Sequence, residues 1–356
     1  MQNILIHVED PGALNLLEGI PESIKKLGVK TTLLAEGVAK KKLGNHPDLL
    51  IREGLSAKEI IKRCSPSLII VGTSENSNSF SFEIIMEARS LKIHTIGLID
   101  MWCNAKNRFR GDSSDSLFYS PNELFVPDKK TLQTFIKIGF DPKNLTLVGN
   151  PVFEKALGWK KKLENEKSPL QKNPLRITFI SEGWDKLDAN ASKKNPYYLM
   201  HGRNDSNFRT IIVMQELIDS LKLLDISYLT TLRVHPNSNL QDFLPIANEF
   251  DQISFKEHPY EVCMNSHVVV GMTSMLLLEA CLLGKPTIAV LPDINEKNWM
   301  PNTEYGPTIT VSSRDELNTY WIKKKYLDNK LEIPNWVILN YKEKFIERVA
   351  EIIFNK

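Results

Sequence analysis

The chain has 356 residues, 42% hydrophobic and 25% charged, and its 45 basic and 43 acidic side chains leave a formal net charge of +2. This length exceeds what one hydrophobic core usually serves, so two domains are expected. This charge balance gives no reason to expect nucleic-acid binding, which needs a concentrated basic face. Short lysine runs predict solvated faces, with a peripheral contact to an anionic membrane surface as the alternative; they lie at Lys40–Lys42, Lys160–Lys162 and Lys323–Lys325.

The four cysteines match the spacing of neither a zinc site nor a disulfide framework, so reduced thiols in a cytoplasmic protein are expected; they are Cys64, Cys103, Cys263 and Cys281. The segment Met1–Val8 is a short apolar strand without the features of a signal peptide. No apolar stretch is long enough to span a bilayer. We therefore expect a cytoplasmic location, with membrane association through peripheral contact at most. The composition leaves the oligomeric state open.

Short β-branched runs alternate with longer amphipathic stretches, the pattern of parallel sheets covered by helices. In the first half, strands are expected at Asn3–Val8, Thr31–Ala35, Leu68–Gly72, His94–Ile99, Leu124–Val126 and Leu145–Val148. Apolar spacing predicts a helix over Leu16–Leu27. Turn residues at Val148–Pro151 close this half, so the first domain is expected to cover residues 1–155.

A segment rich in lysine, glutamate and asparagine then predicts a linker over residues 156–174. The second domain, residues 175–335, is expected to hold strands at Arg176–Ile180, Ser227–Val234, Val268–Val270 and Thr287–Val290, with a helix over Ile211–Leu223. Apolar spacing over Trp336–Lys356 predicts a last helix, which we expect to pack on the first domain. The fold class is therefore α/β, with two Rossmann-like domains and a ligand cleft between them.

The strongest candidate site is Val268–Pro286, where a buried strand ends at Gly271 and Thr273 or Ser274 caps a helix. A phosphate at that helix N-terminus would meet backbone N–H groups, a hydroxyl and the helix dipole. Glu279, one turn further on, suits both hydroxyls of a ribose. An ordinary capped helix with a chance glutamate is the alternative.

A second candidate is Leu232–Pro236, at the end of an expected strand. Pro236 stops the strand and fixes the backbone that carries His235, whose imidazole could donate to a phosphate oxygen. Arg233 adds a fixed positive charge. A loop histidine with a structural hydrogen bond is the alternative.

A third candidate is Val8–Asn15, in which Glu9 and Asp10 precede Gly12 in a turn into a helix. One of the two carboxylates could act as a base, with the neighbouring acid raising its pKa. N-capping by Asp10 is the alternative.

Two more loops follow expected strands. Asp100, after the strand His94–Ile99, is an alternative base, while Trp102 could stack on a sugar and Asn104 and Arg108 could bind hydroxyls or a carboxylate of an acceptor. A surface loop with one packed tryptophan is the alternative. Glu182, after the strand Arg176–Ile180, is expected on the donor side.

The layout around Ser274, Glu279 and Gly284-Lys285-Pro286 resembles the nucleotide-binding element of GT-B glycosyltransferases. Together the motifs resemble bacterial sialyltransferases of that fold, with Glu9-Asp10 and Gly12 matching an acidic-acidic-Gly motif, His235-Pro236 a His-Pro motif, and Thr273-Ser274 the pair that holds the CMP phosphate. Pro11 interrupts the first motif. The chain is more distantly similar to UDP-GlcNAc 2-epimerases, which share the nucleotide-binding element and a His-Pro-Asn-like segment, but open with a Gly-Thr-Arg-Pro-Glu-type loop that this chain lacks.

The resemblance implies an inverting glycosyltransferase of GT-B fold, its last helix crossing back to the first domain. It would transfer a CMP-activated acidic sugar, such as a sialic-acid-like nonulosonate or Kdo, to a surface-glycan acceptor. No Asp-X-Asp pair follows a strand, so no metal and no cofactor besides the nucleotide-sugar co-substrate is expected. The alternatives are a UDP-sugar-dependent hexosyltransferase, a non-hydrolysing sugar-nucleotide 2-epimerase, a teichoic-acid-type polyol-phosphate transferase and a nucleotide-binding protein without catalysis.

Overall fold

The computed structural model describes residues 3–44, 46–74, 76–166, 170–171, 173–183, 197–203, 206–236, 238–299, 309–328 and 345–355. These residues fall into two compact units. The first unit takes its residues from Met1–Glu154 and Leu339–Lys356, and the second from Lys155–Ile338. Each unit is described by itself below.

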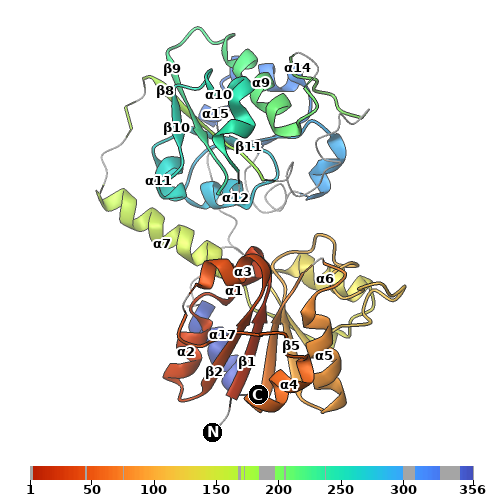
Figure 1. The fold of residues 1–356 in the computed structure, drawn as a ribbon. Coiled ribbons are helices and arrows are strands. Elements are labelled where there is room, and N and C mark those ends of the chain that lie inside the picture. The colour runs from red at the N-terminus through yellow and green to blue at the C-terminus, as the bar shows by residue number, and fades with distance from the viewer. Residues whose placement is uncertain are drawn as a thin grey trace. The chain divides into compact units, whose positions relative to one another are not determined.

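The first unit is built on a seven-stranded parallel sheet with the strand order β3-β2-β1-β4-β5-β6-β7 (Figure 1). Its strands are β1 (Asn3–Val8), β2 (Lys30–Ala35), β3 (Leu49–Leu50), β4 (Leu68–Gly72), β5 (His94–Leu98), β6 (Glu123–Val126) and β7 (Leu145–Leu147). In the centre, Ile6 lies opposite both Leu33 and Ile70. All six strands expected in this half are present, and the short edge strand β3 is an addition.

Both faces of this sheet are covered, which explains why its central strands are continuous apolar runs. Successive side chains of a strand point to opposite faces. Accordingly, Ile4 and Ile6 belong to one buried cluster with α1, α2 and α17, whereas Leu5 and Ile69 belong to another with α4 and α5. The helices are α1 (Pro11–Leu17), α2 (Ile20–Lys26), α3 (Gly37–Leu43), α4 (Ala57–Cys64), α5 (Phe80–Ser90), α6 (Lys129–Lys137), the 3₁₀ turn η1 (Pro142–Asn144) and α17 (Phe345–Phe354).

Two helix predictions need comment. The single helix expected over Leu16–Leu27 is wrong: α1 ends at Leu17 and α2 begins at Ile20, because Gly19 between them takes a left-handed conformation with φ of 84°. Of the helix expected over Trp336–Lys356, the structure describes α17, while residues 336–344 lie outside the described residues. Phe345 and Val349 of α17 are buried in the first unit, against α2.

The second unit is built on a six-stranded parallel sheet with the order β10-β9-β8-β11-β12-β13. Its strands are β8 (Leu175–Ile180), β9 (Tyr228–Arg233), β10 (Gln252–Ser254), β11 (Val268–Gly271), β12 (Thr287–Val290) and β13 (Ile309–Val311). The four expected strands are present, and β10 and β13 are additions at the two edges.

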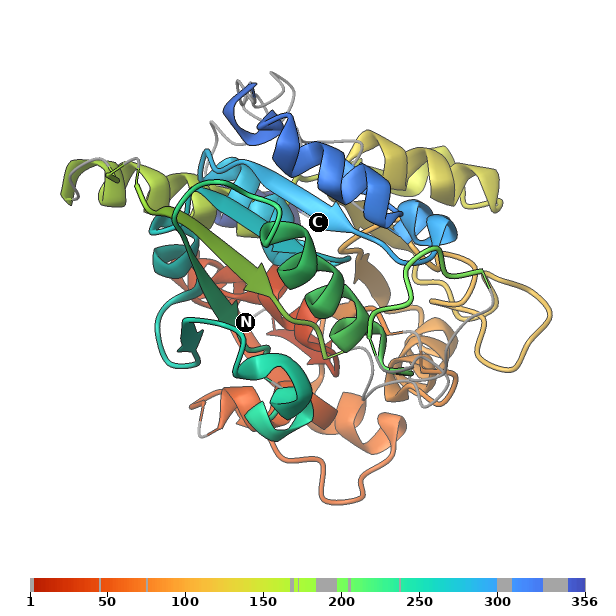
Figure 2. The ribbon, with the colours of Figure 1, turned by 90° about the horizontal axis from the view of Figure 1, so that it is seen from above.

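The helical segments are α7 (Pro151–Glu166), α9 (Arg209–Leu221), η2 (Leu240–Phe243), α10 (Leu244–Ala247), α11 (Pro259–Met264), α12 (Met275–Leu282), η3 (Ile294–Trp299), α14 (Arg314–Ile322) and α15 (Lys325–Asp328). Helix α7 begins in the first unit and occupies most of the segment expected as a linker. Helices α9 and α14, both drawn over the second sheet in Figure 2, contact each other.

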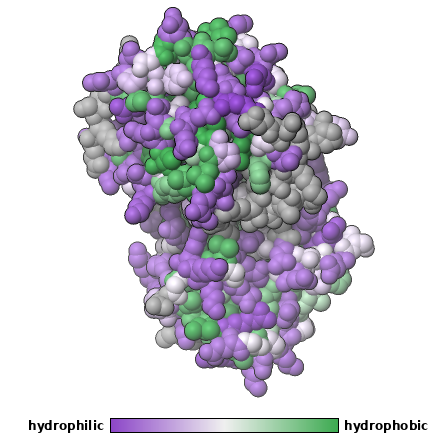
Figure 3. Space-filling view, turned by 45° about the horizontal axis from the view of Figure 1, so that its top comes forward, coloured by the Kyte–Doolittle hydropathy of each residue, from purple (hydrophilic) through white to green (hydrophobic). Residues whose placement is uncertain are grey.

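Both sheets are parallel and doubly wound, so the expected α/β class with two Rossmann-like domains is confirmed. Among the described residues, no helix combines the length and the apolar character that crossing a membrane requires. On the face shown in Figure 3, hydrophilic residues predominate and apolar ones are interspersed among them.

Candidate functional site

Each sheet reverses its strand order beside its first strand, between β1 and β4 in the first unit and between β8 and β11 in the second. The loops that leave two such strands diverge, and ligands of open α/β sheets bind in the crevice outside their carboxyl ends. In the first unit, these loops begin at Glu9 and Thr73. In the second unit, they begin at Ser181 and Met272. The sequence-predicted residues after β1, β8 and β11 therefore stand at the two switch points.

Helix α12 carries the predicted phosphate site. The Ser274 hydroxyl caps the helix by accepting the Leu276 N–H at 3.2 Å. Gly271 lets the strand approach the helix closely, since a Cβ there would lie 3.1 Å from the Leu277 side chain. The first turn of α12 thus presents its backbone N–H groups and the positive end of its dipole beyond the edge of the sheet.

A buried charge network supports the loop before this helix. Thr273 donates its hydroxyl to the Glu182 carboxylate, with oxygen–oxygen distances of 3.0 and 3.2 Å. Glu182 lies 2.9 Å from Arg209, which makes two further hydrogen bonds of 2.7 and 2.6 Å to Glu296. Arg209 is 1% exposed. Burial lowers the pKa of Arg209, but the charges and hydrogen bonds of Glu182 and Glu296 together outweigh it and raise the pKa above the usual range, so the guanidinium stays charged. Glu182, predicted on the donor side, thus positions Thr273.

Arg209 and Glu296 were missed in the sequence. The sequence feature that could have indicated Arg209 is its place as a single arginine at the start of the strongly apolar helix α9. Its partner Glu296 is 87 residues further along the chain, so no local pattern connects the two.

His235 lies beside the loop after β8. Its backbone N–H donates to the Ser181 hydroxyl at 2.8 Å, which links the loops after β9 and β8. The imidazole packs against Gly183, where a Cβ would lie 2.9 Å from Nδ1. Pro236 follows as expected and is exposed. A role of His235 toward a phosphate stays a prediction.

Arg233 is turned toward the edge strand β10. Its guanidinium donates to the Ser254 hydroxyl at 3.0 Å and lies 4.0 Å from the Glu257 carboxylate. Burial lowers the pKa of Arg233. The predicted donor contact of Arg233 stays a prediction, and the bonds in the structure are those of a residue that ties β9 to β10.

Glu279 is half-buried on α12, and its surroundings make it unusual. Burial raises the pKa of its carboxyl to about 7, and the pull from a Tyr260 hydroxyl bond and from the charge of Lys155 is weaker. Tyr260 is itself buried and packs edge-on against Trp159 of α7. A carboxylate that loses its water in this way favours a ligand that donates hydrogen bonds to it.

In the first unit, Asp100 and Arg108 form the central pair after β5. Arg108 Nη1 lies 2.7 Å from Asp100 Oδ1, and Arg108 also donates to the Thr73 hydroxyl at 2.9 Å and to the Cys103 carbonyl at 3.1 Å. The other carboxylate oxygen, Oδ2, faces Gly12, where a Cβ would lie only 2.8 Å away. Thus Gly12 of α1 lies beside Asp100 and Arg108, which belong to one loop much further along the chain.

The other predicted residues of this unit have different surroundings. Glu9 accepts the Phe80 N–H at 2.7 Å and so lies at the N-terminus of α5. Burial raises the pKa of Glu9, while hydrogen bonds from Phe80 and Ser79 act in the opposite direction. Asp10 precedes α1 without capping it through its side chain. The N-capping alternative holds for the position of Asp10, whose carbonyl accepts the Leu14 N–H at 3.0 Å, but not for its side chain.

Trp102 and Asn104 were predicted to contact an acceptor. Trp102 is buried, and the ammonium of Lys130 lies 3.9 Å from the centre of its ring, so that ring face is already covered. Asn104 is exposed and takes a left-handed conformation with φ of 54°. Acceptor binding by these residues stays a prediction.

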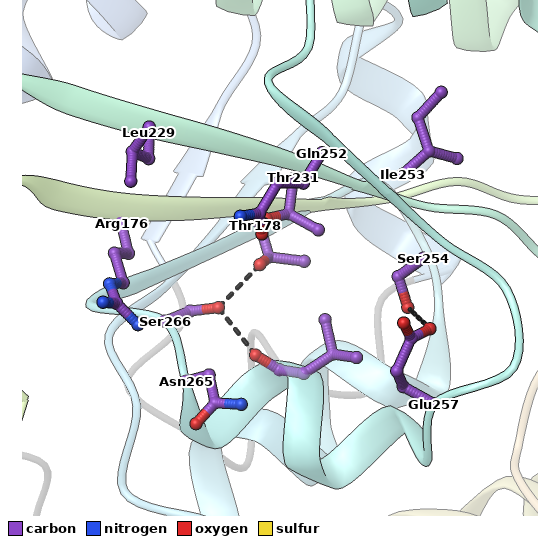
Figure 4. A pocket seen from close by; sticks show the side chains of 11 residues that line it. Arg176, Thr178, Leu229, Thr231, Gln252, Ile253, Ser254, Glu257, Asn265 and Ser266 are labelled. Atoms are coloured by element: carbon purple, nitrogen blue, oxygen red, sulfur yellow. Dashed lines mark hydrogen bonds between the residues drawn. The ribbon is translucent and has the colours of Figure 1, made fainter.

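A polar cavity of about 260 Å³ lies elsewhere in the second unit, against β8, β9, β10 and α11 (Figure 4). Its inner hydroxyls are bonded to protein groups: Thr178 to Ser266 at 2.6 Å, and Ser254 to Glu257 at 2.7 Å. None of the predicted site residues is among those that line it.

Neither a protein-family model nor a curated protein sequence matches the chain. The solved UDP-GlcNAc 2-epimerase of Methanocaldococcus jannaschii matches it with a TM-score of 0.64 at 13% identity, over 100% of both chains. The UDP-GlcNAc 2-epimerase of Neisseria meningitidis, solved with UDP-GlcNAc bound, matches with a TM-score of 0.62 at 14% identity, over 100% of this chain and 99% of that chain. The Anabaena protein Alr3699/HepE, solved with UDP and glucose, matches with a TM-score of 0.57 at 11% identity, over 100% of both chains.

At these identities the likeness is one of fold, a GT-B-like pair of Rossmann-type domains. At that level it supports the more distant of the two resemblances seen in the sequence, that to UDP-GlcNAc 2-epimerases. It gives no support to the sialyltransferase resemblance.

Proposed function

We propose that the protein is a sugar-nucleotide enzyme that binds a UDP-N-acetylhexosamine and inverts its C2 carbon, as a non-hydrolysing 2-epimerase. The observation that carries this proposal is the match of the whole chain, over the whole length of the partner, to UDP-GlcNAc 2-epimerases, one of them solved with UDP-GlcNAc and UDP. The alternative drawn from the sequence thus replaces the CMP-sialyltransferase as the leading hypothesis.

The second unit supplies groups that suit the nucleotide. The N-terminus of α12 suits a phosphate, and the Thr273 hydroxyl beside it is held by Glu182. Glu279, one turn further along, could accept both ribose hydroxyls, which would replace the water its carboxylate has lost. Gly183 leaves room for the imidazole of His235 beside the same loops.

The first unit supplies Asp100 as the proposed acid–base residue. Of the three carboxylates predicted for this role, Glu9 is bound at the N-terminus of α5. Asp100 instead is aligned by Arg108, which is itself fixed by Thr73 and the Cys103 carbonyl. A carboxylate held in place by an ion pair with such a fixed arginine suits proton transfer.

The chemistry of the inversion defines what Asp100 would do. The C2–H bond of the sugar breaks from one face and re-forms on the other. Because this carbon is not next to a carbonyl, loss of its proton is coupled to departure of UDP from C1. The sugar then carries a C1=C2 double bond until UDP adds back. UDP returns to C1 when C2 regains a proton. Asp100 would exchange that proton, and the α12 N-terminus would stabilise the departing pyrophosphate.

The test is incubation with UDP-GlcNAc in D₂O without any acceptor, followed by proton NMR. We expect the 2-epimer to appear and deuterium to enter at C2, with no free sugar released. Deuterium-free UDP-GlcNAc after prolonged incubation, together with UDP binding shown by calorimetry, would refute epimerisation while leaving nucleotide binding in place.

A CMP-sugar transferase is the second candidate, favoured by the His235-Pro236 and Thr273-Ser274 pairs of the sequence. It predicts that CMP, and not UDP, raises the thermal stability, because a ligand that binds only the folded state stabilises it. Stabilisation by UDP alone would withdraw this candidate.

A further inference from the structure

We propose that His7, Glu9 and Glu36 form a binding site for one divalent transition-metal ion, with Zn²⁺ as the preferred occupant. The three residues lie at the carboxyl ends of β1 and β2 in the first unit. One nitrogen of His7 and one oxygen of each carboxylate all lie within 4.8 Å of one another. This proposal does not depend on the proposed reaction.

His7 is the central observation. Its side chain is 0% exposed, yet its Nε2 atom has no hydrogen-bond partner and lies 3.7 Å from a carboxylate oxygen of Glu9. Leaving a buried polar atom without a partner is unfavourable, so this arrangement calls for a bound group. Among the described residues it is the only buried histidine whose free nitrogen faces two carboxylates.

The other ring nitrogen determines which form of the imidazole is present. Nδ1 lies 2.8 Å from the Ser81 hydroxyl, and that hydroxyl donates its own proton to the Gly72 carbonyl at 3.4 Å. The Ser81 oxygen therefore accepts the Nδ1 proton, which leaves a lone pair on Nε2. Metal-binding histidines show this pattern, in which the second nitrogen donates to a fixed partner. The lone pair and two carboxylates then converge as three electron donors.

The spacing fits a small cation. Zn²⁺ binds histidine nitrogen at about 2.0–2.1 Å and carboxylate oxygen at about 2.0–2.2 Å, which puts neighbouring ligands of a tetrahedron about 3.4 Å apart. The 3.7 Å between His7 and Glu9 is close to that separation. Imidazole with carboxylates is a donor set of the borderline metals, among which Zn²⁺ binds more tightly than Mn²⁺.

The surrounding charge leaves room for a cation. Arg52 lies 2.7 Å from Glu36 and stacks over the Phe80 ring at 3.5 Å, so its guanidinium offsets the charge of one of the two carboxylates and leaves that of the other. Glu9 keeps lone pairs beside the one that accepts the Phe80 N–H. Glu36 precedes α3 without capping it, and its side chain is 25% exposed, which gives an ion a path from solvent.

The experiment uses the full chain, stripped of metal by a chelator and titrated with Zn²⁺ in a calorimeter. We expect one equivalent to bind, and Glu36→Gln and His7→Gln to weaken that binding at least tenfold. Glu36→Gln changes a partly exposed side chain, so it keeps the test valid if His7→Gln fails to fold. The matched control is His46→Gln, because the partly exposed His46 lies against Glu22 and Asp48 in the same unit and its replacement should not affect binding.

Titration with Co²⁺ distinguishes this site from the free cysteines. Binding at His7, Glu9 and Glu36 gives visible absorption without a sulfur-to-cobalt charge-transfer band. Appearance of such a band would overturn the proposal. So would the absence of stoichiometric binding by the parent chain, or equal binding by the parent chain and the Glu36→Gln variant. Loss of binding in His46→Gln instead would place the ion at His46, Glu22 and Asp48 and overturn the proposal as well.

Discussion

Replacing Glu279 by glutamine is expected to stabilise the protein and weaken its nucleotide binding at the same time. Burial raises the pKa of this carboxyl from 4.5 to about 7 in the folded chain. Between those two values the folded state holds a proton that the unfolded state releases, so stability falls as pH rises through this range. Above pH 7 the charged Glu279 carboxylate therefore destabilises the folded chain by its full amount, and below pH 4.5 it does not destabilise it.

The magnitude follows from the size of the shift. A pKa difference of about 2.5 units corresponds to about 3 kcal/mol, since each unit is worth about 1.4 kcal/mol. Glu279→Gln keeps the shape of the side chain and removes the charge. The free energy of unfolding should therefore rise by up to about 3 kcal/mol at pH 8, and by nearly nothing at pH 4.5.

The effect on UDP has the opposite sign. Hydrogen bonds to a charged group contribute about 1.5–3 kcal/mol, so losing the charged acceptor of the ribose hydroxyls should weaken UDP binding about 10- to 100-fold. For the parent chain, affinity for UDP should fall as pH drops below 7, because a proton competes with the ribose.

The assay is urea unfolding at pH 4.5 and pH 8, with UDP calorimetry at pH 8. Glu257→Gln is the matched control, because the pKa of that exposed carboxyl is lowered, chiefly by the Ser254 hydroxyl bond, and its neutralisation should give no stabilisation at pH 8. A Glu279→Gln variant that is equally or less stable than its parent at pH 8 would refute the reasoning about burial. Unchanged UDP affinity would remove Glu279 from the nucleotide site.

Three further predictions follow from the two switch points. Arg209→Met leaves Glu182 and Glu296 buried without a counter-charge and should cost about 3–5 kcal/mol in urea unfolding at pH 7; a cost under 1 kcal/mol would show that the network contributes little. Asp100→Asn should abolish deuterium entry at C2 and leave the calorimetric affinity for UDP within about twofold, whereas exchange at the parent rate would place the base elsewhere. Gly183→Ala puts a methyl group 2.9 Å from His235 Nδ1 and should weaken UDP binding about tenfold; Gly158→Ala, where a Cβ meets nothing within 4 Å, is its control, and equal affinities of the two variants would exclude a role of the imidazole.

The sequence by itself determined the class of fold and most of the strands. The strands β1, β4 and β12 begin and end at the residues expected, because a parallel strand buried on both faces must be a continuous apolar run. The residues just after such strands could be chosen as site candidates for the same reason. All carboxyl ends of a parallel sheet lie at one edge, so Asp100, Glu182 and Thr273 could be named as candidates without knowing the neighbours of each strand.

Only the tertiary structure decided which side chains meet at those edges. Arg209 contacts Glu296 across 87 residues, and His7 faces Glu36 from the next strand, and neither pairing leaves a periodic signal in the chain. The edge strand β10, Gln252–Ser254, has only three residues and, among the described strands, pairs with β9 alone. Strand order decides these contacts, and it is fixed by packing between segments that are distant in sequence. Local propensity and hydrophobic period describe one segment at a time. They therefore predict the helices and strands of this protein, but not which side chains meet at its candidate site.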